Sequence, residues 1–175
     1  MHRLLMVLIL VAVGVGCIGY GTYAKDQSQG PGKVQKEKKA IMTTHASGTF
    51  EVKLSPQSPD DKAEGATVGR FSLDKKFQGD LEATSKGEML AVSTTIQGSA
   101  GYVAMEQVTG TLNGHTGTFA LQHTGTMNRG VPQLSVTVVP DSGTGQLVGL
   151  AGKMDIKIAG GNHFYEFEYT LAEKP

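Results

Sequence analysis

The 175-residue chain has no tryptophan, a single cysteine and few aromatic side chains, which make up 6% of the sequence. One cysteine excludes an internal disulfide framework and a zinc cluster built on cysteines. Sixteen Lys and Arg residues balance sixteen Asp and Glu residues, and a net charge of zero excludes a strongly basic nucleic-acid-binding protein. Glycine, at 24 residues, is about twice as frequent as usual. The length indicates one domain.

The first 24 residues have the pattern of a targeting segment. Met1-His2-Arg3 precedes a run without charges that extends from Leu4 to Ala24. The small residues at the end of this run are typical of the cleavage site of an exported signal peptide. The run is also long enough to cross a bilayer as an uncleaved membrane anchor, and Cys17 leaves lipidation as a third alternative. We therefore expect an exported (periplasmic or secreted) or membrane-anchored protein, which contacts a membrane only through this segment if it is retained.

Residues 25–42 are polar, contain glycine and proline, and include five lysines at Lys25, Lys33, Lys36, Lys38 and Lys39. They have no periodicity, so they are predicted to form a flexible linker. Lysines that follow an uncleaved helix favour the cytoplasmic side, which leaves open on which side of a membrane the domain lies. The domain itself is expected over residues 43–175.

Alternation of apolar and polar residues continues from Ala46 to Leu171, and turn signals interrupt it at intervals. No segment has the 3.6-residue period of an amphipathic helix. Residues 56–61 are expected to be the only long irregular connection. Eight strands are predicted, over residues 46–54, 67–77, 88–97, 102–112, 115–127, 132–140, 146–159 and 162–171.

Turn signals predict the registers, because both strands of a hairpin must bury the same face. The turn at Asn113-Gly114 places Glu106 opposite Leu121 and Ala104 opposite His123. Three further turns, at residues 128–131, 141–145 and 160–161, bury the same face of the remaining hairpins. The second of these turns would place Val138 opposite Val148 and Val136 opposite Leu150.

These hairpins predict an all-β fold, an eight-stranded antiparallel meander closed into a small β-barrel. Closure removes unpaired strand edges and encloses one apolar face. The buried residues should include Val108, Phe119, Val136, Leu150, Ile156 and Phe167, and the exposed ones Lys153, Asp155, Lys157 and Glu168.

Three stretches carry a family resemblance: YVAMEQVTGTLNGHTGTFALQHTGTM (102–127), SGTGQLVGLAGKM (142–154) and HFYEFEY (163–169). In this order they resemble the bacterial family catalogued as domain of unknown function 3224, over about residues 43–172. The resemblance implies a small antiparallel barrel similar to that of plant allene oxide cyclase, and it implies no established activity. The targeting segment and linker depart from the many family members that look like bare domains.

Five polar side chains on the inward face do not belong in a purely apolar interior: Tyr102, Glu106, His123, His163 and Tyr165. Glu106 and Tyr102 each lie diagonal to His123 across a hairpin. We consider these residues candidates for ligand binding, and no catalytic residue is assigned. A satisfied polar cluster, a ligand-orienting set and acid–base catalysis remain alternatives, and catalysis would require an apolar lining that raises the pKa of Glu106.

No cofactor or metal is expected, because His123, His163 and Glu106 lack the spacing of a metal site. Gly143-Thr144-Gly145 is interpreted as a hairpin turn and not as a phosphate-binding loop. Three function classes follow for the barrel, with its oligomeric state left open. It is a binding module for a small apolar ligand in its interior, a structural barrel filled by side chains, or an isomerase or cyclase acting on an apolar, fatty-acid-like substrate. The last rests on the analogy with allene oxide cyclase alone, so whether the protein is an enzyme stays uncertain.

Overall fold

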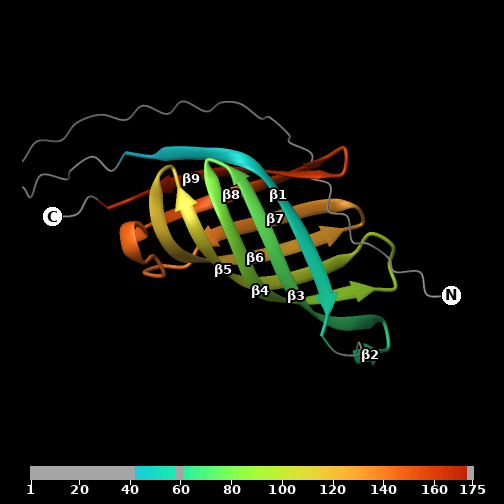
Figure 1. Ribbon diagram of the computed structural model, residues 1–175. Helices are drawn as coiled ribbons and strands as arrows, with labels where there is room; N and C mark the ends of the chain where they lie inside the picture. The colour runs from blue at the N-terminus through green and yellow to red at the C-terminus, as the bar shows by residue number, and fades with distance from the viewer. Residues whose placement is uncertain (1–41, 58–60, 173–175) are drawn as a thin grey trace, which may run out of the picture.

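Antiparallel strands make up almost all of the computed structural model, which describes residues 42–57 and 61–172 (Figure 1). The expected targeting segment and nearly all of the expected linker lie outside these residues. No helix in the described part of the chain is long and apolar enough to cross a membrane. The elements are β1 (Thr44–Pro56), β2 (Asp61–Ala63), β3 (Ala66–Gly79), β4 (Leu81–Thr94), β5 (Ala100–Leu112), β6 (His115–Asn128), β7 (Val131–Val138), the 3-10 turn η1 (Gly145–Leu147), β8 (Ala151–Ala159) and β9 (Asn162–Thr170).

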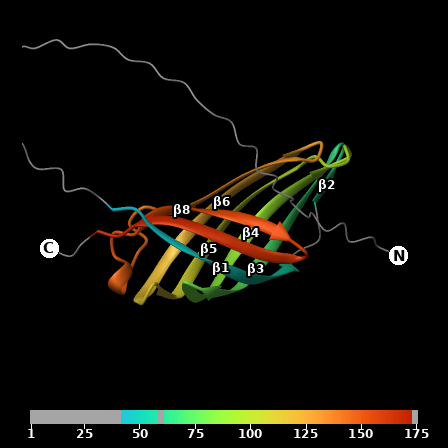
Figure 2. The same cartoon turned by 90° about the horizontal axis from the view of Figure 1, so that it is seen from above.

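The sheet closes on itself through β1. Neighbouring strands follow the order β1-β9-β8-β7-β6-β5-β4-β3-β2, and β1 also pairs with β3. The first half of β1 pairs with β9 and its second half with β3, while the short β2 only extends the edge of β3. Eight strands therefore form the wall, as predicted, and Figure 2 shows them curling around a common interior.

Most of the predicted registers are confirmed. The β5–β6 hairpin pairs Glu106 with Leu121 and Ala104 with His123, and the predicted registers of β6–β7 and β8–β9 are present as well. The residues predicted to be buried are so, except for Ile156, which is half-buried. Of the residues predicted to be exposed, only Glu168 is partly covered.

The predicted strand over residues 88–97 was wrong in its bounds, because β4 begins at Leu81 and ends at Thr94. Its first half carries the small inward residues Ala83, Ser85 and Gly87. Because these residues are small or polar, the sequence shows no apolar alternation over this half of β4. Their side chains nevertheless alternate between the inner and outer faces of the sheet. Similarly, part of the expected irregular connection forms β2, which begins at Asp61.

The predicted strand over residues 146–159 was also too long, since β8 begins at Ala151. Residues 139–150 form a loop that folds along β6, where the Thr144 N–H donates to the Thr118 carbonyl at 2.8 Å. Val148 is exposed and does not face Val138, so the two pairings predicted from a turn at 141–145 are wrong. Strands β7 and β8 pair at one position, between Thr137 and Lys153.

The two ends of the barrel differ. We call the end formed by the loop 139–150 and by the β3–β4 and β5–β6 turns the closed end, and the opposite end the open end. In Figure 1 the dark orange loop at the left of the view, which contains the single coiled turn, marks the closed end. Leu147 of η1 points into it and is 1% exposed, and Leu81, Leu112 and Leu150 fill the space around it. Inward-facing side chains at the open end are only half-buried, among them Phe71, Met89, Tyr102, Leu134 and Ile158.

Candidate functional site

A cluster of four polar side chains lies between the apolar closed end and the open end. Lys75, Ser85, Glu106 and His123 come from β3, β4, β5 and β6, four consecutive strands of the wall. All four are buried, with exposed fractions between 2% and 8%. Buried polar side chains are stable only when they bind one another or water, so their mutual contacts decide what the cluster does.

Glu106 is the centre of this polar cluster. Its Oε1 lies 2.8 Å from Lys75 Nζ and 2.8 Å from His123 Nε2. Its Oε2 accepts a hydrogen bond of 2.7 Å from the Ser85 hydroxyl. Within residues 42–57 and 64–172, no buried side-chain nitrogen or oxygen lacks a partner. The polar cluster is therefore compatible with a stable core.

Small residues of β4 allow Lys75 to reach Glu106. β4 lies between β3 and β5, where Ser85 pairs with Lys75 and Gly87 pairs with Glu106. A Cβ at Gly87 would lie 2.7 Å from the Cα of Glu106, so a larger residue does not fit there. The Lys75 ammonium also lies 5.0 Å from the centre of the Phe50 ring, which gives it a favourable cation–π contact.

The carboxyl of Glu106 is ionised at neutral pH. Burial raises its pKa, but the hydrogen bond from His123 and the charge of Lys75 outweigh burial and lower the pKa to about 2. The sequence-based hypothesis of catalysis required a raised pKa, and that requirement is not met. The reason is that His123 donates a hydrogen bond to the carboxylate and that the charge of Lys75 stabilises it further.

His123 is neutral at neutral pH, because burial lowers its pKa more than the hydrogen bond to Glu106 raises it. Nε2 faces the ionised Glu106 and must donate, so Nδ1 carries the lone pair and accepts. No described residue forms a hydrogen bond with Nδ1. Since no fully buried polar side-chain atom of the described residues lacks a partner, Nδ1 is not completely enclosed, although the His123 side chain as a whole is only 5% exposed.

Tyr102 and His163 lie nearer the open end. Tyr102 is half-buried, and burial together with the charge of Glu106 raises its pKa to about 12, so its hydroxyl stays protonated. Its ring lies against Gly125, where any Cβ would collide with it. The His163 ring contacts Phe50, with 5.0 Å between ring centres. Burial and the nearby charge of Lys75 lower the pKa of His163.

The comparisons with known proteins identify the family. The model of the family described as "Protein of unknown function (DUF3224)" matches residues 46–169. The chain belongs to this family. It is similar to the crystal structure of a protein of unknown function from the DUF3224 family of Shewanella oneidensis MR-1, with 48% sequence identity and a TM-score of 0.73. The match covers 76% of this chain and 100% of the other. No curated protein matches the chain.

In this DUF3224 barrel, the five candidate residues are not all together. Glu106 and His123 are in contact as predicted, and the charge of Glu106 acts on Tyr102. Tyr165 lies apart, with its hydroxyl accepting a hydrogen bond of 2.8 Å from the Leu81 N–H. Tyr165 therefore has a structural contact near the β3–β4 turn, at the closed end.

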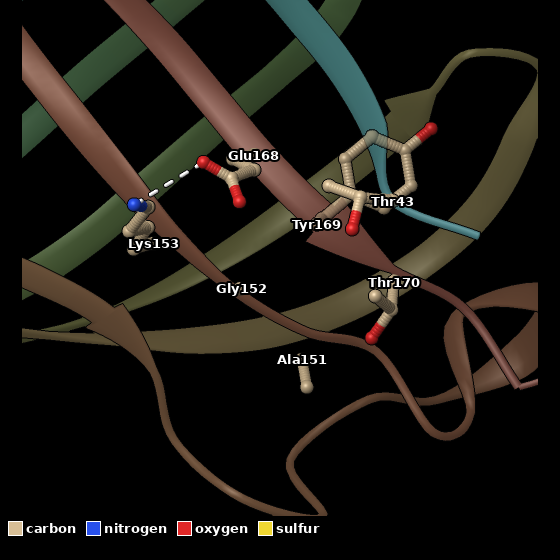
Figure 3. Close-up of a pocket in the computed structure, with 7 residues that line it drawn as sticks. All are labelled: Thr43, Ala151, Gly152, Lys153, Glu168, Tyr169 and Thr170. Carbon is tan, nitrogen blue, oxygen red and sulfur yellow. Dashed lines mark ion pairs between the residues drawn. The ribbon is translucent and has the colours of Figure 1, made fainter. Parts of the chain in front are cut away.

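Sequence reasoning missed Lys75 and Ser85. Both could have been found from alternation, since Lys75 lies two residues from Leu73 and two from Phe77 on the inward face. Two hollows of this DUF3224 chain lie on the outer wall of the barrel, away from the polar cluster. Figure 3 shows the one over β8 and β9, which the Lys153–Glu168 ion pair (3.2 Å) borders. None of the candidate residues lines either hollow.

Proposed function

We propose that this DUF3224 barrel is a binding module that takes a small apolar ligand through its open end. The ligand would lie among the half-buried apolar side chains and reach toward the polar cluster of Lys75, Ser85, Glu106 and His123. The observation that carries the proposal is the inward-facing acceptor atom His123 Nδ1, which has no hydrogen-bond partner among the described residues.

The difference between the two ends supports this placement. At the closed end, the inward-facing leucines are at most 2% exposed. At the open end, Phe71, Met89 and Leu134 face inward and remain half-buried. A purely structural barrel gains stability by burying such side chains at both ends. Apolar walls with a few convergent polar groups are the usual composition of a small-molecule site.

Binding is favoured over the isomerase or cyclase alternative. A carboxyl with a pKa of about 2 does not donate a proton near neutral pH, and it is a poor base there. Lys75 holds the charge of Glu106 at 2.8 Å, so proton transfer would disrupt a buried ion pair. The polar cluster is better suited to orient a ligand than to exchange protons with it.

The experiment is native mass spectrometry of the full-length protein purified from its own cells. We expect a retained small molecule in the parent protein. Leu134→Trp should fill the open end and remove this ligand, whereas Val148→Trp, on an exposed position of the closed end, should retain it. Circular dichroism checks that both variants fold. The absence of any bound molecule in the parent, or equal retention in both variants, would contradict the proposal.

A further inference from the structure

The charges inside the barrel cancel within the polar cluster. Among the residues whose side chains the structure describes, Lys75 and Glu106 are buried ionised groups, and they form an ion pair of 2.8 Å with exposed side-chain fractions of 5% and 0%. His123, the third titratable member, is neutral. A carboxylate that enters from the open end would therefore find no unpaired cation in the cluster, and burying an unpaired charge is costly.

The open polar atom of the cluster accepts hydrogen bonds and does not donate them. His123 Nε2 donates to Glu106 Oε1, so Nδ1 presents a lone pair. Tyr102 offers a protonated hydroxyl on the same inward face. It lies two residues before Ala104, the residue that pairs with His123. A ligand hydroxyl can donate to Nδ1 and accept from a phenol. An ionised carboxylate has no hydrogen to donate, and its lone pairs would face the lone pair of Nδ1.

We infer that the ligand is an apolar molecule with a neutral head group that donates a hydrogen bond, such as an apolar alcohol, and that it is not a free carboxylate. This inference rests on the proposed binding function. The geometry that carries it is the internal pairing of Lys75 with Glu106 and the acceptor orientation of His123.

The experiment compares three probes with the same alkyl chain: 1-decanol, decanoate and decyl methyl ether. Each is titrated into the full-length protein at pH 7.5 by isothermal titration calorimetry, below its aggregation concentration. We expect 1-decanol to bind about 10- to 100-fold more tightly than decanoate, the effect of one unsatisfied buried polar contact. The ether keeps the oxygen but has no hydrogen to donate, so it should also bind about tenfold more weakly than 1-decanol.

The outcomes separate the two proposals. If decanoate binds as tightly as 1-decanol, the inference of a neutral head group is overturned and the proposed binding function stays intact. An ether that binds as tightly as the alcohol would overturn hydrogen-bond donation to His123. If none of the three probes binds, the binding function fails for apolar chains. Leu134→Trp should abolish decanol binding and Val148→Trp should not, which assigns the measured heat to the open end.

Discussion

Lys75 and Glu106 form a buried ion pair between two strands that are not neighbours in the wall. β4 separates β3 from β5, and the Lys75 side chain passes over the small residues Ser85 and Gly87 to reach the carboxylate at 2.8 Å. Each charge is thus the counterion of the other. Removing either one leaves the other without a partner in a low-dielectric interior.

Glu106→Gln is therefore expected to destabilise the fold by about 3–5 kcal/mol, because it leaves the Lys75 charge buried and unpaired. Guanidinium unfolding followed by circular dichroism measures the free energy of unfolding, and a value equal to that of the parent would contradict the buried pair.

The double variant Lys75→Met with Glu106→Gln is the matched control. It removes both charges and keeps an amide that can accept from His123. We expect it to recover much of the stability lost in Glu106→Gln, because a neutral pair of similar volume has no unpaired charge. Additive effects of the two substitutions would show that the charges are not coupled.

The stability of the barrel should fall as the pH falls. The pKa of His123 is lowered in the folded state, so the unfolded chain binds the proton first and stability begins to decrease below about pH 6.5. Glu106 has its folded pKa lowered from 4.5 to about 2. Its contribution, on the order of 3 kcal/mol, is present above pH 4.5 and is lost between pH 4.5 and 2. Thermal unfolding from pH 8 to 3 measures this, and the double variant should lose less stability below pH 4.5.

Leu147 should be the main residue that holds the closed end together. It is 1% exposed inside the barrel, while its neighbour Val148 is 57% exposed. Leu147→Ala is expected to lower the free energy of unfolding by about 2–5 kcal/mol through lost burial and a cavity. Val148→Ala, in the same loop, should change it by less than about 0.5 kcal/mol. Similar effects of the two substitutions would argue that the loop does not plug this end.

Gly87 should not tolerate a side chain. A Cβ there would collide with the Met105 carbonyl oxygen and with Glu106 on the neighbouring strand, whereas a Cβ at Gly101 meets no atom closer than 3.7 Å. Gly87→Ala is expected to destabilise the barrel by about 1–3 kcal/mol through overpacking, and Gly101→Ala should be near neutral. Thermal unfolding compares the two, and a neutral Gly87→Ala would show that β4 and β5 can separate without cost.

Much of the fold could be predicted because tight turns determine hairpin registers. Asn113-Gly114 leaves one way to pair β5 with β6, and the alternation of both strands agrees with it. The second half of the loop 139–150 was assigned to a strand, because Val148 and Leu150 continue the alternation of β8. What decides its conformation is that Leu147 fills the closed end, a contact with strands distant in the sequence.

The candidate site was predictable only in part. Glu106 and His123 lie on neighbouring strands, so the register places them together. Lys75 approaches across an intervening strand, and that contact depends on the curvature of the wall, which alternation does not describe. A charged residue such as Lys75 is also normally predicted to lie on the surface. The catalytic alternative required a raised pKa of Glu106, and Lys75, which together with His123 lowers this pKa, was not identified from the sequence.

β7 and β8 pair at a single position, so this junction is the least extensively hydrogen-bonded one in the wall of the barrel. The first and last strands of the wall are neighbours, since Thr44 pairs with Tyr169. Linking the chain across that junction and cutting it within residues 139–150 would yield a circular permutant in which every extended strand pairing is preserved. The order in which the strands are synthesised is then separable from the architecture they form.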